Sequence, residues 1–69
     1  MRYRIEFLTE TTKEESVCMS AFSEGPLEAA EQYALSLADR AETKHGAEGF
    51  QIRDLFEDGR IVALRPFDS

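Results

Sequence analysis

Residues 26–46 read PLEAAEQYALSLADRAETKHG, and this stretch decides the fold because it carries the helical periodicity of the chain. Its apolar residues recur at steps of three and four, which places them along one side of a helix. They are Leu27, Ala30, Ala34, Leu37, Ala38 and Ala41. Pro26 suits the first helical position with Gly25 as N-cap, and Gly46 can adopt the left-handed conformation that ends a helix. The stretch predicts one amphipathic helix whose apolar side packs on a sheet.

Period-two alternation on both sides of this helix predicts four strands. Residues 3–8 and 16–22 precede it and are joined by a polar, acidic loop, so we expect them to form a hairpin. In the second of these strands, Val17, Met19 and Ala21 should share one face. Residues 50–56 and 60–67 follow the helix, and the Asp-Gly pair between them is a strong hairpin signal.

The resulting order is ββαββ, an α+β fold in which a four-stranded antiparallel sheet carries one helix on one face. Because the helix reverses the chain direction, the third strand can lie antiparallel beside the first, and we expect the strand order 2-1-3-4. A chain of 69 residues supports one hydrophobic core. Residues 1–69 are therefore expected to form a single domain.

Two positions depart from the alternating pattern. Asp54 has the parity of Phe50 and Ile52, so either a bulge changes its facing or its carboxylate lies at the edge of the core. Residues 61–64 are apolar without alternation, which indicates a side of the sheet that this chain does not cover. A homodimer could bury that side. Its expected contacts are Val62, Leu64 and Phe67.

The charge of the chain limits the classes of partner. Eight Lys and Arg residues stand against 14 Asp and Glu residues, a formal net charge of −6. This charge repels phosphate, so we expect no direct binding to nucleic acid or to an anionic membrane. No apolar run approaches the roughly 18 residues of a membrane span, and no signal-peptide pattern is seen. With Cys18 as the single cysteine, these features favour a cytoplasmic protein.

No set of residues has the pattern of a catalytic or metal-binding site, and we expect neither enzyme activity nor a cofactor. His45 falls in the last helical turn, where a cation is favourable, and Cys18 has no base predicted nearby. Arg2, Arg4 and Arg53 are expected on the sheet face away from the helix. Stacked single-stranded nucleic acid could lie there, but the net charge favours pairing of these arginines with Glu6 and neighbouring acids across the strands.

The helix side away from the apolar residues carries carboxylates around one leucine. We call this set the acidic stripe, and its members are Glu28, Glu31, Leu35, Asp39 and Glu42. Two interpretations remain open. Charged helix faces are commonly just solvated, whereas a docking surface would use the acids to steer a basic partner and Leu35 for buried contact.

The ββαββ order, the length and the acidity resemble those of several small phage-encoded anti-CRISPR proteins, which inhibit by covering the basic nucleic-acid surface of a CRISPR effector. The segment from Phe50-Gln51-Ile52-Arg53-Asp54 to Asp58-Gly59-Arg60-Ile61-Val62, after an alanine-rich helix, is also similar to small uncharacterised bacterial proteins of the same order. The first resemblance implies a non-enzymatic inhibitor that covers a basic surface of another protein, and neither resemblance assigns site residues. The alternative is an uncharacterised bacterial homodimeric domain with a structural or regulatory role.

Overall fold

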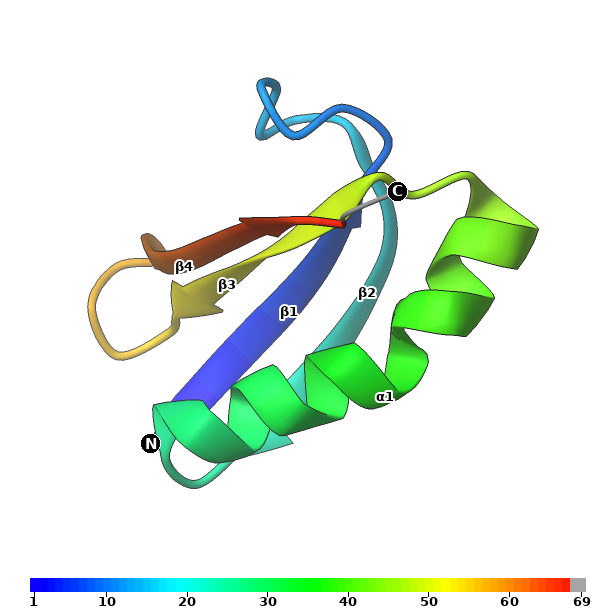
Figure 1. The fold of residues 1–69 in the computed structure, drawn as a ribbon. Helices are drawn as coiled ribbons and strands as arrows, with labels where there is room; N and C mark the ends of the chain where they lie inside the picture. Colours follow the sequence, from blue (N-terminus) through cyan, green and yellow to red (C-terminus); the bar gives the residue numbers. More distant parts are fainter. Residues whose placement is uncertain (68–69) are drawn as a thin grey trace.

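The computed structural model describes residues 1–67 and, within them, four strands and one helix in the order ββαββ (Figure 1). Strand β1 is Arg2–Leu8, β2 is Val17–Glu24, helix α1 is Leu27–His45, β3 is Gly49–Asp54 and β4 is Arg60–Pro66. All neighbouring strands are antiparallel, in the order β2-β1-β3-β4. The predicted fold class and strand order are confirmed.

Helix α1 begins one residue later than expected and ends where expected. Pro26 has an extended backbone (φ −74°, ψ 161°) and occupies the N-cap, while Gly25 lies in the preceding turn with a φ of +105°. At the other end, Gly46 has a φ of +70° and its N–H donates to the carbonyl of Glu42. The prediction of Gly25 as N-cap is wrong, because Gly25 is needed for the positive-φ turn that leads out of β2.

The hydrophobic core lies between α1 and one face of the sheet. Tyr3, Ile5 and Phe7 of β1 stand opposite Ser23, Ala21 and Met19 of β2, and Phe50 and Ile52 of β3 flank them on the other side. The helix supplies fully buried small residues, namely Ala30, Ala34 and Ala41. Small side chains let the helix approach the sheet closely, so the large core residues come mainly from the two central strands.

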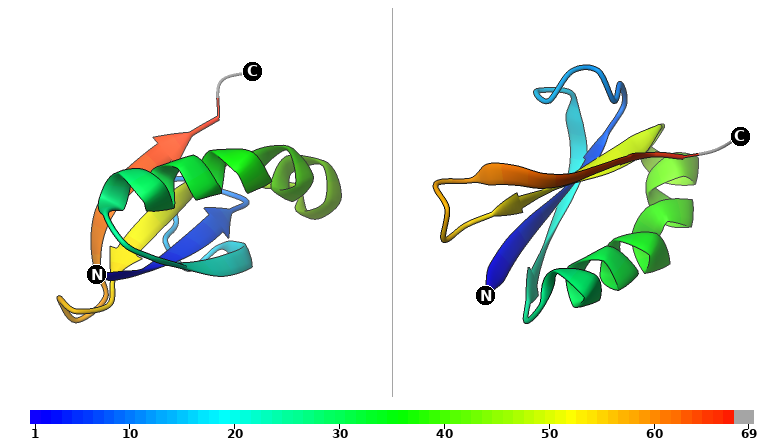
Figure 2. Two further views of the ribbon diagram at one scale, coloured as in Figure 1. Left: turned by 90° about the horizontal axis from the view of Figure 1, so that it is seen from below. Right: turned by 60° about the vertical axis from the view of Figure 1, so that its left-hand side comes forward.

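Helix α1 covers β1, β2 and β3, whereas β4 extends beyond it (Figure 2). Phe67, which follows β4, fills the core on that side. Its ring centroid lies 6.4 Å from that of Phe7 and 6.2 Å from that of Phe50. Phe67 therefore packs within the core of its own chain.

Each edge strand has a register irregularity. The β1–β2 register shifts between Phe7 and Leu8, and the β3–β4 register shifts between Ile52 and Arg53. Because Val17 pairs with Leu8 while Met19 pairs with Phe7, Val17 and Met19 lie on opposite faces. The expectation that they share a face is wrong, since alternation continues only where the register is regular.

Asp54 ends β3 and organises the turn that follows it. Its carboxylate accepts a 2.9 Å hydrogen bond from the N–H of Phe56, and its carbonyl accepts from the N–H of Gly59. Asp58 and Gly59 have φ values of +58° and +75°, as the Asp-Gly signal predicts. Of the two readings of Asp54, the buried carboxylate at the edge of the core is confirmed, and the strand stops before Phe56.

Candidate functional site

The sheet face away from the helix, called here the open face, is the first candidate surface. Cross-strand pairs define two of its rows: Phe22, Arg4 and Arg53 form one, and Ser20, Glu6, Gln51 and Leu64 form the next. On β4, Ile61 pairs with Arg53 and continues the first row, and Val62 is the extra residue where the β3–β4 register shifts. The open face is thus polar at its centre and apolar toward both edges.

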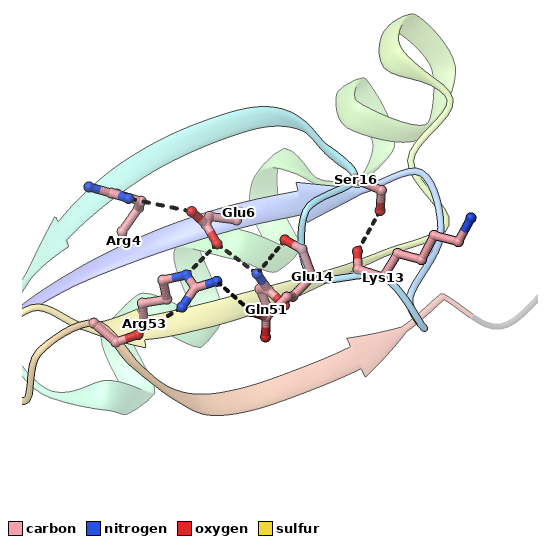
Figure 3. A network of polar contacts seen from close by, with 8 residues as sticks. Arg4, Glu6, Lys13, Glu14, Ser16, Gln51 and Arg53 are labelled. Atoms are coloured by element: carbon pink, nitrogen blue, oxygen red, sulfur yellow. Dashed lines mark hydrogen bonds and ion pairs between the residues drawn. The ribbon is translucent and has the colours of Figure 1, made fainter.

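A buried carboxylate occupies the centre of the open face (Figure 3). Glu6 accepts hydrogen bonds of 2.7 Å from Nε2 of Gln51 and 2.7 Å from Nε of Arg53, and Arg4 lies 3.5 Å away. Arg53 also donates from Nη1 to the carbonyl of Gly59 at 2.9 Å. Arg53 therefore pairs with Glu6 across the strands, Arg2 pairs with Glu24 of β2, and Arg4 approaches Glu6 within β1, which leaves no cluster of unpaired cations at the centre of this face among residues 1–67.

The loop between β1 and β2, residues 9–16, folds over one end of the open face. Nε2 of Gln51 donates to the carbonyl of Glu14 at 3.2 Å, and Ser16 Oγ donates within the loop to the carbonyls of Glu10 and Lys13. Gly49 lacks a side chain beneath this loop, and Thr11 takes the space that a Cβ would need. The loop therefore helps to bury Glu6 although no helix covers this face.

The pKa of Glu6 is lower than its ordinary value of 4.5. Burial alone would raise this pKa by penalising the charged form. Hydrogen bonds from Gln51 and Arg53, the positive charge of Arg53 and the contact with Arg4 outweigh burial. Glu6 is thus held as a carboxylate, a state suited to a structural link.

Large apolar side chains on the open face remain accessible to solvent. The exposed fractions are 58% for Phe22, 50% for Leu64 and 39% for Val17, and Val62, at the register shift of β4, is 38% exposed. The guanidinium of Arg4 lies over the ring of Phe22, 5.7 Å from its centroid, and covers part of that ring. Of the three residues expected at a dimer contact, Leu64 lies on this face, Val62 is the extra residue at the register shift of β4, and Phe67 lies on the helix side.

The acidic stripe on α1 is the second candidate surface. Glu28, Asp39 and Glu42 are exposed, and Leu35 is 47% exposed. Glu31 differs, because its carboxylate pairs with Arg65 of β4 at 3.3 Å and is only 26% exposed. The outer part of the stripe therefore consists of three carboxylates around Leu35, and Glu31 links the helix to the strand that extends beyond it.

Neither of the two residues considered for chemistry, Cys18 and His45, belongs to a recognisable catalytic or metal-binding cluster among residues 1–67. Cys18 is a half-buried free thiol whose Sγ lies 3.5 Å from the carbonyl of Phe7, and His45 is exposed in the last helical turn. Residues 1–67 hold no group of three His, Cys, Asp or Glu side chains placed to bind a metal ion. In the same part of the chain, no helix has the length and apolar character needed to cross a membrane.

Comparison with known proteins returns no match to any family model, curated protein or solved structure.

Sequence reasoning located the arginines of the open face but missed Gln51 as a partner of Glu6. The two residues are 45 positions apart and meet only because β1 and β3 pair with Glu6 opposite Gln51. Parity offered a usable signal for Phe67, since an odd-numbered residue in a regular strand faces away from Val62 and Leu64. The Glu31–Arg65 pair had no signal in the sequence, because its geometry depends on how the helix crosses the sheet.

Proposed function

We propose that this chain is a small, non-enzymatic protein-interaction module whose acidic stripe docks on a basic surface of another protein. By occupying a surface that would otherwise hold nucleic acid, it would act as an inhibitor of the anti-CRISPR kind. The exposed setting of Glu28, Asp39 and Glu42 around Leu35 is the single observation that carries the proposal. A cytoplasmic location belongs to the same proposal.

Charge supports a basic protein as the partner. The net charge of −6 gives the chain a negative field that accelerates encounter with a cationic surface and opposes nucleic acid. Leu35 adds an apolar contact in the middle of the carboxylates, and a desolvated centre within a polar rim is the usual anatomy of an interface. Glu31, already paired with Arg65, orients the helix instead of contacting the partner directly.

The test compares two double variants with the same change in net charge. Asp39→Lys with Glu42→Lys reverses the outer acidic stripe, whereas Glu10→Lys with Glu57→Lys reverses exposed carboxylates outside the helix. Each protein, immobilised, is used to capture proteins from the source cell, with and without added nucleic acid as competitor. We expect the wild type and the second variant to capture the same basic, nucleic-acid-binding protein, the first variant to lose it, and nucleic acid to displace it.

The salt dependence of partner association provides an independent test of the proposal. Screening of exposed charges strengthens as the Debye length falls from about 30 Å at 0.01 M to about 8 Å at 0.15 M salt. The association rate of the captured protein should fall over this range in the wild type and change less in the stripe variant. Equal capture by both double variants, or capture that nucleic acid does not affect, would overturn the proposal.

The second candidate function is a homodimeric domain with a structural or regulatory role. The exposed apolar side chains of the open face favour it. Since they lie on the other side of the sheet from the acidic stripe, dimer formation and partner binding would use separate surfaces.

A further inference from the structure

We infer that the open face binds a second copy of this chain. The two copies pack face to face about a two-fold axis that runs perpendicular to the strands. The apolar residues Phe22, Ile61 and Leu64 would form the contact, and both helices would point outward.

The sheet face, and not a sheet edge, is the surface suited to a second chain. Both edge strands have a register irregularity, and β4 ends at Pro66, which has no N–H to donate. Such features oppose pairing of one edge strand with another. The loop of residues 9–16 covers only the end of the open face near Gly49. The part of the face around Phe22, Ile61 and Leu64 therefore has no comparable obstacle.

The polar centre of the open face can be covered at little cost. Glu6 already has its donors in Gln51 and Arg53, and Arg53 has a further acceptor in Gly59. Buried polar groups that keep their partners avoid the penalty of unpaired charge. The formal charge of the face is also zero, since three arginines balance three glutamates; these are Arg2, Arg4, Arg53, Glu6, Glu14 and Glu24. A chain with net charge −6 can thus meet its own copy here without local repulsion.

The register of the strands makes this face complementary to itself. The row of Arg4 adjoins the row of Glu6, so rotation about the proposed axis places Arg4 of one copy opposite Glu6 of the other. Ile61 pairs with Arg53 and so belongs to the row of Arg4, and the same rotation places Ile61 opposite Leu64 of the second copy, twice by symmetry.

The arginines of the open face distinguish the proposed axis from the alternative one. An axis parallel to the strands would instead place Arg4 opposite Arg53 of the second copy, a repulsive contact.

Two leucines of nearly equal exposure provide a matched test. Leu64→Asp alters the open face and Leu35→Asp alters the helix, and the wild-type side chains are 50% and 47% exposed. The molar mass of the full chain is measured by sedimentation equilibrium from micromolar to millimolar concentration, with circular dichroism as a check of fold. We expect a wild-type dimer, an increase of about tenfold or more in the dissociation constant for Leu64→Asp, and less than about twofold for Leu35→Asp.

A wild-type chain that stays monomeric at millimolar concentration overturns the inference. So does a dimer that Leu35→Asp weakens and Leu64→Asp leaves intact. If Leu64→Asp does not fold, Phe22→Ser replaces it with the same expectation. Partner capture through the acidic stripe is unaffected by these outcomes, because Leu64→Asp leaves the helix unchanged.

Discussion

Replacing Glu6 by Gln removes the charge at the centre of the open face while keeping the shape of the side chain. Gln51 and Arg53 both donate to Oε1 of Glu6, so a single amide oxygen can still accept from both, but it carries no charge, and an amide NH₂ would replace Oε2 beside the guanidinium of Arg4. Two charge-assisted hydrogen bonds thus become weaker neutral ones, at a cost of about 1 kcal/mol each. The cost is not larger because Arg53 keeps its contact with Gly59 and is partly exposed.

We therefore expect Glu6→Gln to lower the free energy of unfolding by about 2 kcal/mol at pH 7. A chain of 69 residues has a total stability of roughly 3–10 kcal/mol, so this is a considerable fraction. The corresponding decrease in Tm is about 8–16 °C. Urea unfolding followed by circular dichroism, at one protein concentration, measures the difference. Glu24→Gln is the control, because the Arg2–Glu24 pair is exposed and contributes at most about 1 kcal/mol.

The pH dependence separates the loss of charge from a simple packing defect. The pKa of Glu6 is lowered in the folded chain, so its contribution to stability is fully present above the ordinary value of 4.5 and is lost as the pH falls through the lower folded value. The difference between wild type and Glu6→Gln should shrink below pH 4.5. A difference that equals that of Glu24→Gln at pH 7, or that persists unchanged at low pH, would refute the reasoning.

Two further substitutions test how the loop and the core are held. Gly49→Ala places a Cβ 2.5 Å from the carbonyl oxygen of Arg65 and against Thr11. We therefore expect the free energy of unfolding, measured in urea, to fall by about 1–3 kcal/mol. Stability equal to wild type would show that loop and strand separate freely. Phe67→Ala removes the ring that packs on Phe7 and Phe50, and we expect a loss of about 3 kcal/mol by the same assay. A loss below about 0.5 kcal/mol would place Phe67 outside the core.

Much of the fold followed from local patterns in the sequence. The helix was delimited by Pro26 and Gly46, and the hairpin of β3 and β4 by Asp58 and Gly59, because these residues have conformational preferences that act without tertiary contacts. The strand order followed from the reversal of the chain by one helix. These features depend on neighbours in sequence, which is why they could be predicted.

The surfaces were harder to predict because they depend on register. The shift beside Leu8 moves Val17 away from the face of Met19. The lack of alternation in residues 61–64 indicated that this chain leaves one side of the sheet uncovered, and Val62 and Leu64 are exposed. It did not indicate that Gln51 meets Glu6 or that Arg65 reaches Glu31, since both contacts join segments distant in sequence.

Arg53 couples the local unfolding of two loops at opposite ends of the sheet. Through Glu6 and Glu14 it is tied to the loop of residues 9–16 at one end of the sheet, and through Gly59 to the turn at the other end. Two loops that would ordinarily fray independently thus share one guanidinium. Their backbone amides should exchange with deuterated solvent as a single cooperative unit, and loosening either end should expose both.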